Sequence, residues 1–207
     1  MMTISLSDTG KRFNRDWIFR HFNYTFDSAN SYAITGPNGS GKSTLLQVVS
    51  GSLHFNEGSI LYTTGKGQLA IEEIYRHVSI CAPYLEVVEE MTLTEFLSFH
   101  QNFKAFLPGI SIDQIITILG LREAADKQIR YYSSGMRQRV KLAQCIFSDT
   151  EIVLLDEPCT NLDSNGIGLY HHLVDTYCTK RLTIVSSNDQ VEYQFCRSII
   201  NILDFKK

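Results

Sequence analysis

The stretch GPNGSGKST, residues 36–44, decides the fold of this chain. The apolar run Tyr32–Thr35 before it is typical of a buried strand, and the stretch Ser43–Val49 after it predicts a helix that Gly51 can end. The glycines let successive backbone N–H groups turn inward, and the following helix directs its positive end toward the same place. The pattern therefore predicts a phosphate-binding loop between a strand and a helix.

Each residue type in this loop has an expected role. Lys42 should reach the β- and γ-phosphates of a nucleotide, and Ser43 should offer its hydroxyl to Mg²⁺. Replacing Lys42 should remove most of the nucleotide affinity. The expected contacts to the nucleotide come from the whole loop, namely Gly36, Pro37, Asn38, Gly39, Ser40, Gly41, Lys42, Ser43 and Thr44.

A second motif, EIVLLDEP at residues 151–158, provides carboxylates. Its apolar run Ile152–Leu155 predicts a strand that delivers Asp156 and Glu157 to its carboxyl end, where α/β sheets bind ligands. We expect Asp156 to hold the magnesium shell and Glu157 to polarise a water that attacks the γ-phosphate. Taken alone, the motif could be an ordinary acidic turn, and the phosphate loop favours the catalytic interpretation.

Length and composition limit the class of protein. The chain has 207 residues, of which 43% are hydrophobic and 20% charged, with a net charge of -3. It lacks the roughly 18 consecutive apolar residues of a membrane span, and its charge gives no electrostatic reason to expect nucleic acid. The 5 cysteines are widely spaced and form no CxxC pair, which favours a reducing cytoplasm. One soluble domain is the expected organisation.

Three buried strands, Tyr32–Thr35, Ile152–Leu155 and Leu182–Ser186, alternate with helical patterns, which indicates an α/β fold with a parallel sheet. Residues 1–30 mix aromatic and polar residues and favour antiparallel strands with one wet face. Residues 84–133 differ, because capping boxes at Thr92 and Ser111 open two helices. We therefore expect one domain over 1–207, with 1–83 and 134–207 forming the core with its β part and 84–133 a helical subdomain.

The segment YYSSGMRQRVKLAQCIF, residues 131–147, predicts an amphipathic helix. Small residues precede the helix, and its N-terminus could bind an anion. A simple N-cap explains Ser133 equally well, so both interpretations stay open here.

Taken together, GPNGSGKST, SSGMRQR at 133–139, LLDEP at 154–158 and TNLD at 160–163 resemble the nucleotide-binding subunit of ATP-binding cassette (ABC) transporters over essentially the whole chain. The resemblance implies a RecA-like P-loop core with an antiparallel β subdomain and a helical subdomain. It also implies that two cassettes, either two copies or this chain and a second cassette, close over ATP and Mg²⁺.

The same resemblance assigns further site residues. Ser133, Ser134 and Gly135 would touch the γ-phosphate held by the other subunit, and Asp163 would belong to the loop that crosses the dimer interface. Phe13 is the first candidate for the aromatic residue that stacks on adenine. Trp17 is the second candidate.

The resemblance further implies an ATPase subunit that drives transport through a separate integral membrane permease. Such a subunit works in the cytoplasm, peripheral to the inner face of the cell membrane, and does not bind nucleic acid. The chain has no long coiled-coil insertion of the kind carried by soluble relatives that act on DNA or ribosomes. A small-metabolite kinase would share the phosphate loop but would not explain SSGMRQR.

Two positions depart from the family pattern. Pro83 stands where the family usually has a glutamine, and Asn188 stands where it has a switch histidine. Proline offers no side-chain donor, and asparagine can donate a hydrogen bond but cannot accept a proton at neutral pH. We therefore expect Glu157 and Asn188 to support slow hydrolysis. The alternative is a regulatory module that dimerises on ATP with little or no hydrolysis.

Overall fold

The structure, a computed structural model, describes residues 1–206. These fold into two compact units. The first unit contains Met1–Val78, Thr150–Glu157 and the C-terminal stretch from Lys180, and the second contains Ser79–Asp149 and Pro158–Thr179. Among residues 1–206, no helix combines the length and the hydropathy of a membrane span.

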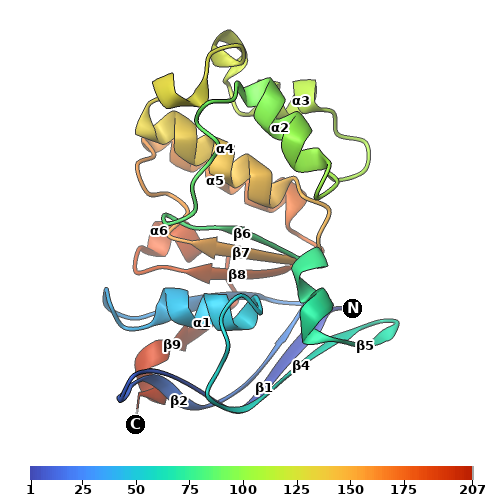
Figure 1. The fold of residues 1–207 in the computed structure, drawn as a ribbon. Coiled ribbons are helices and arrows are strands. Elements are labelled where there is room, and N and C mark those ends of the chain that lie inside the picture. The colour runs from blue at the N-terminus through green and yellow to red at the C-terminus, as the bar shows by residue number, and fades with distance from the viewer. Residues whose placement is uncertain (207) are drawn as a thin grey trace. The chain divides into compact units, whose positions relative to one another are not determined.

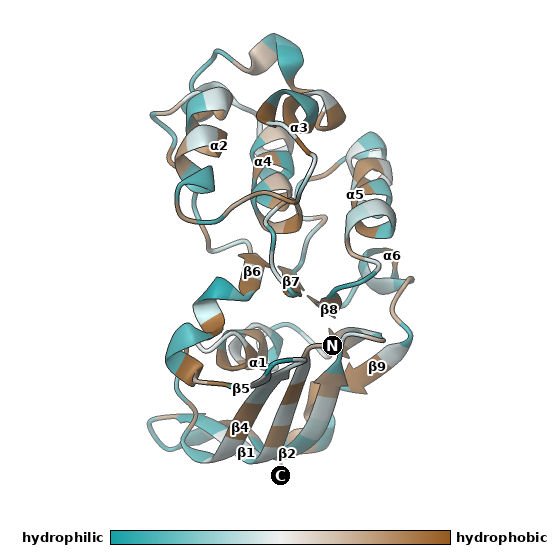
Figure 2. Ribbon diagram, turned by 90° about the vertical axis from the view of Figure 1, so that its right-hand side faces the viewer, coloured by the Kyte–Doolittle hydropathy of each residue, from teal (hydrophilic) through white to brown (hydrophobic). Residues whose placement is uncertain are grey.

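An antiparallel sheet forms one layer of the first unit, with strand order β2-β1-β4-β5. Its strands are β1 (Thr3–Phe13), β2 (Asp16–Asp27), β4 (Glu57–Thr64) and β5 (Gly67–Leu69). The register pairs Ile4 with Phe26, and both side chains are fully buried. Figure 2 shows apolar and polar residues alternating along these strands, as expected for a sheet with one wet face.

A parallel sheet forms the other layer of this unit, in which β7, β8, β3 and β9 are neighbours in that order. Its strands are β3 (Ser31–Thr35), β7 (Ile152–Asp156), β8 (Leu182–Ser186) and β9 (Ser198–Asn201). Every residue of β7 and β8 is buried, which explains their apolar sequences. All three predicted strands are therefore confirmed, and their carboxyl ends meet at one edge.

Helix α1 (Lys42–Val49) follows the phosphate loop and lies between the two sheets of the first unit (Figure 1). It buries Leu45, Leu46, Val48 and Val49. Gly51, at φ +74°, follows its last turn. Smaller elements complete the unit: the 3₁₀ helices η1 (Ile71–Arg76) and η4 (Ile202–Phe205), and helix α6 (Gln190–Tyr193).

The second unit is mainly helical. The chain enters it through β6 (Val78–Cys81), and its helices are α2 (Leu93–Gln101), α3 (Ile112–Ile118), η2 (Arg122–Ala124), η3 (Ile129–Tyr131), α4 (Ser134–Ile146) and α5 (Ser164–Tyr177). Both predicted capping boxes are present, at Thr92 with Glu95 and at Ser111 with Gln114. The sequence pattern therefore located the starts of α2 and α3 correctly.

The second unit extends beyond the range 84–133 that the sequence favoured for the helical subdomain. It also includes α4 and α5, because α4 packs against both α2 and α5. A local pattern marks where each helix begins but not which neighbours it packs against.

Candidate functional site

The phosphate loop of the first unit forms a cradle between β3 and α1. Gly39 and Gly41 have φ values of +75° and +106°, which side chains rarely allow. A Cβ atom at Gly41 would collide with Ile18, whereas one at Gly39 would meet no atom within 4 Å. A cavity of about 200 Å³ opens here, lined by Ile18, Asn38, Gly39, Ser40, Gly41, Lys42, Ser43, Thr44 and Glu157.

Lys42 lies inside this loop rather than in solvent. Its residue is 4% exposed, and its Nζ donates to the carbonyl oxygens of Gly36 at 2.8 Å and Pro37 at 3.3 Å. Because an ammonium group has three donors, these two bonds hold the lysine and leave it a donor for an anion.

Three buried oxygens near the carboxyl ends of the strands lack a hydrogen-bond partner among the described residues: Ser40 Oγ, Asp156 Oδ1 and Ser186 Oγ. The exposed fractions of these residues are 3%, 1% and 0%. Asp156 and Ser186 are paired in register on β7 and β8, so their side chains project to the same face of the sheet. Buried polar atoms are nearly always bonded, so this face fits a ligand that brings its own polar groups.

The donor set at this edge suits a magnesium ion with a phosphate. Mg²⁺ prefers oxygen ligands and usually keeps several waters. Asp156 supplies an unpartnered carboxylate oxygen, and Ser43 supplies a hydroxyl at the cavity. The residues present therefore fit the metal that the sequence predicted.

Glu157 follows directly and lines the same cavity. Its φ is +43°, a left-handed conformation that is uncommon for glutamate, and its N–H donates to the Ser186 carbonyl at 2.9 Å. Such backbone conformations persist where the surrounding structure enforces them, often at functional sites. The structure thus brings Glu157 to the loop, as the sequence predicted.

Asn188 also meets the loop. Its Oδ1 accepts from the Gly36 N–H at 3.3 Å, and its Nδ2 donates to Asn38 Oδ1 at 2.9 Å. The predicted switch position therefore lies at the cradle and contacts two of its residues.

The two aromatic candidates have different surroundings. Phe13 is 46% exposed, with Lys11 Nζ 4.9 Å from its ring centroid. The Trp17 ring carries the guanidinium groups of Arg12 and Arg20, at 5.4 Å and 4.5 Å from its centroid. Phe13 thus has one cation at its ring and Trp17 has two, and stacking of adenine on Phe13 stays a prediction.

Neither aromatic residue lines the cavity, but Ile18 on β2 does. The sequence reasoning missed Ile18. Its only signal was its place beside Trp17 in a strand that precedes the loop.

The second unit holds the remaining predicted site residues. Ser133 is the N-cap of α4, and its Oγ accepts from the Met136 N–H at 3.2 Å, so the N-cap interpretation is confirmed. Ser134 begins the helix. A Cβ atom at Gly135 would lie 3.0 Å from the carbonyl oxygen of Asn161, so the chain passes close to this glycine.

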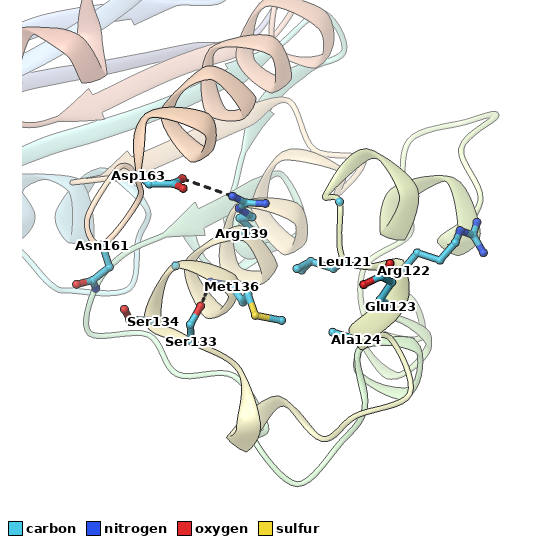
Figure 3. Close-up of a pocket in the computed structure, with 12 residues that line it drawn as sticks. Leu121, Arg122, Glu123, Ala124, Ser133, Ser134, Met136, Arg139, Asn161 and Asp163 are labelled. Carbon is cyan, nitrogen blue, oxygen red and sulfur yellow. Dashed lines mark hydrogen bonds and ion pairs between the residues drawn. The ribbon is translucent and has the colours of Figure 1, made fainter.

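Asp163 lies nearby as the N-cap of α5. Its Oδ1 accepts from the Gly166 N–H at 2.8 Å and lies 3.5 Å from Arg139 Nη2. Figure 3 shows the side chains of Asp163 and Arg139 pointing toward one another. A cavity of about 660 Å³ is lined by Gly120, Leu121, Arg122, Glu123, Ala124, Ser133, Ser134, Gly135, Met136, Arg139, Asn161 and Asp163.

Pro83, the first departure from the family pattern, is exposed. Its carbonyl oxygen accepts from Lys141 Nζ at 3.1 Å. Gln138 on α4 is 4% exposed, and its Nε2 donates to the Pro158 carbonyl at 2.7 Å. The side-chain amide of Gln138 is thus bonded to the backbone, and Pro83 offers a carbonyl in place of a side-chain group.

Comparisons with known proteins agree with this fold. The ABC transporter family model matches residues 19–160. The chain is 29% identical over 170 residues to the uncharacterized ABC transporter ATP-binding protein YhcH of Bacillus subtilis, covering 79% of this chain and 54% of that protein. It is 33% identical over 144 residues to the cytochrome c biogenesis ATP-binding export protein CcmA of Xylella fastidiosa, covering 70% of this chain and 64% of that protein.

Among solved structures, a dimeric bacterial ABC transporter cassette superimposes with a TM-score of 0.81 at 20% identity, covering 96% of this chain and 94% of the cassette. This confirms the predicted fold class, an α/β RecA-like core with an antiparallel β part and a helical part. The chain therefore belongs to the ABC transporter family and has the fold of its nucleotide-binding cassettes.

Proposed function

We propose that this chain is the ATP-binding subunit of an ABC transporter, which binds Mg-ATP at a dimer interface and hydrolyses it slowly to drive transport. The observation that carries the proposal is the buried, unpartnered pair Ser40 Oγ and Asp156 Oδ1 beside the glycine cradle. These atoms fit a ligand with its own oxygens and metal shell, and no other described part of the first unit supplies them with partners.

The loop would hold the phosphates. Its backbone N–H groups and Lys42 bind negative charge, and the N-terminus of α1 adds its dipole. Ser43 and Asp156 would hold Mg²⁺, which when bound offsets the charge of the phosphate oxygens. Phe13 would support adenine through the exposed side of its ring.

Two cassettes would complete the site. Ser133, Ser134 and Gly135 at the start of α4 would meet the phosphate held by the partner subunit, and Asp163 would belong to the loop that crosses the dimer interface. The likeness to a dimeric cassette supports this arrangement. The open cavity beside Ser133 and Asp163 also supports it, because backbone N–H groups at a helix start are available to an anion. The second cassette would be either another copy of this chain or a different cassette.

Hydrolysis should be slow. Glu157 lines the loop cavity and would polarise the attacking water. Asn188 cannot take up a proton, and Pro83 has no side-chain donor. Losing one preorganised donor typically costs about 10²–10³ in rate, so turnover should be well below that of a cassette with both groups.

Transport would require a separate integral membrane permease, which would hold this subunit at the inner face of the cell membrane. The relatives support this partner class, since one is an export protein. The cargo and its direction would be decided by the permease.

A second candidate function is an ATP-gated dimerising regulator with little or no hydrolysis. It is favoured by the engagement of both polar atoms of Asn188 with the loop, because a side chain bound there would not orient the attacking water.

Turnover of the purified protein in Mg-ATP separates the two candidates. The transporter proposal predicts phosphate release that Glu157→Gln and Lys42→Ala each abolish, with nucleotide binding kept by the first variant and lost by the second. Equal phosphate release from the wild type and Glu157→Gln would leave only the regulator function. If Lys42→Ala binds nucleotide as tightly as the wild type, both candidate functions are refuted.

A further inference from the structure

Asn188 occupies a switch position, yet its side chain is bound to the phosphate loop itself. Its Oδ1 accepts from the Gly36 N–H at 3.3 Å, and its Nδ2 donates to Asn38 Oδ1 at 2.9 Å. A backbone N–H can only donate, so this contact fixes which end of the Asn188 amide faces Gly36. Both polar atoms of the side chain therefore have partners on the loop.

The backbone that carries Asn188 is held in place. The Ser187 N–H donates to the Ile34 carbonyl at 3.1 Å, which ties this turn to the end of β3. The Asp189 N–H donates to Ser187 Oγ at 2.9 Å, and Asp189 caps α6. Asn188 thus reaches the loop from a fixed point.

Lys42 holds the same part of the loop through its backbone carbonyls. Its Nζ donates to the carbonyls of Gly36 and Pro37, while Asn188 binds the Gly36 N–H and the Asn38 side chain. The segment Gly36–Asn38, here called the entry limb, is therefore tied to α1 by a cation and to the turn after β8 by an amide.

These two ties respond differently to a nucleotide. A phosphate competes for Lys42, because an ammonium group binds an anion more strongly than a neutral carbonyl. Asn188 is neutral, and its bonds run to the loop itself, so it can keep the entry limb in place while Lys42 turns to the phosphate.

We infer that Asn188 is a positioning residue that holds the entry limb in its phosphate-binding shape, acting through Gly36 and Asn38 rather than on the γ-phosphate. This inference rests on the proposed nucleotide-binding function and goes beyond it, because it assigns the switch position a role in forming the loop. Asn188 should therefore contribute equally to the affinity for ADP and to the affinity for ATP.

The test is a double-mutant cycle with Asn188→Ala, Asn38→Ala and the double variant. Affinities are measured by calorimetry for Mg-ADP and for Mg²⁺ with a non-hydrolysable ATP analogue. Loss of two hydrogen bonds to the loop should weaken both ligands by the same factor, about 3- to 10-fold. Asn38→Ala should weaken both by about 2- to 4-fold and should have no further effect in the Asn188→Ala background.

Two outcomes of the cycle would overturn the inference. If Asn188→Ala weakens the ATP analogue and leaves ADP unchanged, Asn188 contacts the γ-phosphate. If the effects of Asn38→Ala and Asn188→Ala add, Asn38 does not act through Asn188. Asn102→Ala, which removes an exposed amide of the second unit, is the control and should leave both affinities unchanged.

Hydrogen exchange without nucleotide provides a readout that separates this inference from the proposed function. Peptides covering the entry limb should exchange faster in Asn188→Ala, while Asn38→Asp, which keeps an acceptor for Asn188 Nδ2, should exchange like the wild type. Unchanged exchange in Asn188→Ala would overturn the inference. Faster exchange in a protein that binds neither nucleotide would support the role in the loop and refute the proposed function.

Discussion

Ser40→Ala should stabilise the ligand-free protein, although it removes a polar group. Ser40 is 3% exposed, and its Oγ has no partner among the described residues. An unpaired buried polar group costs about 1–3 kcal/mol. After allowing for the small void that the oxygen leaves, the gain should be about 1–2 kcal/mol. For a chain of this size, that raises Tm by about 2–8 °C.

Ser50→Ala is the matched control, because Ser50 is also buried but its hydroxyl is bonded. Ser50 Oγ donates to the Gln47 carbonyl at 2.8 Å and lies 2.8 Å from Ser52 Oγ. Its removal should lower Tm, with a loss of about 1 kcal/mol. The same substitution at two buried serines next to α1 should thus have opposite signs.

Nucleotide should reverse the effect at Ser40. If the unpartnered oxygen meets a phosphate or its metal shell, Ser40→Ala loses that contact, and affinity should fall by about 5- to 10-fold. Ligand stabilises a folded protein by about 2.7 kcal/mol at 100 times Kd, so the rise in Tm on adding Mg-ATP should be smaller in the variant.

The assay is differential scanning calorimetry of wild type, Ser40→Ala and Ser50→Ala, each with and without Mg-ATP. A lower Tm for ligand-free Ser40→Ala would mean that its hydroxyl already has a partner, and the fit of the cradle to a ligand would lose its main support. An unchanged response to Mg-ATP would mean that the hydroxyl faces no part of the nucleotide.

Three further predictions concern the second unit. Gly135→Ala places a Cβ 3.0 Å from the Asn161 carbonyl and should lower the free energy of unfolding by about 1 kcal/mol. It should leave the Mg-ADP affinity unchanged in calorimetry and weaken ATP-dependent pairing of two copies in ultracentrifugation. Unchanged pairing would contradict the proposed contact of Gly135 with the partner's nucleotide. Asp163→Ala loses the N-cap of α5 and should cost about 1 kcal/mol in urea unfolding, whereas Asp163→Asn should retain most of that stability. Burial lowers the pKa of His100 to about 4, so the folded protein resists a proton that the unfolded chain accepts. The contribution of neutral His100 to stability is therefore fully present above about pH 6.5 and is lost as the pH drops toward 4. His100→Gln should make Tm depend less on pH between these values, and an unchanged dependence of Tm on pH would contradict the lowered pKa of His100.

Much of the fold follows from local patterns. The strand, the glycine turn and the helix at residues 31–49 form as expected, because the loop needs positive φ values that glycine adopts without strain. The capping boxes at Thr92 and Ser111 are also local, since each pairs residues three positions apart. Such signals are complete within a few residues and can be read from the chain.

The relations that the sequence could not predict join distant residues. Asn38 and Asn188 are 150 positions apart, and nothing local to either asparagine indicates the other. The contact of Ile18 with Gly41 depends on how β2 approaches the loop. The extent of the second unit likewise depends on the packing of α4 and α5. Tertiary packing decides these features, and a local pattern does not encode it.

The central claim is that the cradle around Lys42 binds Mg-ATP firmly enough to join two cassettes. Sedimentation of Glu157→Gln tests it most directly, because this variant should hold ATP without cleaving it. With millimolar Mg-ATP the account predicts a dimer of twice the 23.5 kDa chain mass. With Mg-ADP, or with the Lys42→Ala variant, it predicts a monomer. A monomer that binds Mg-ATP would contradict the pairing of two copies. A monomer that binds no nucleotide would contradict the account as a whole.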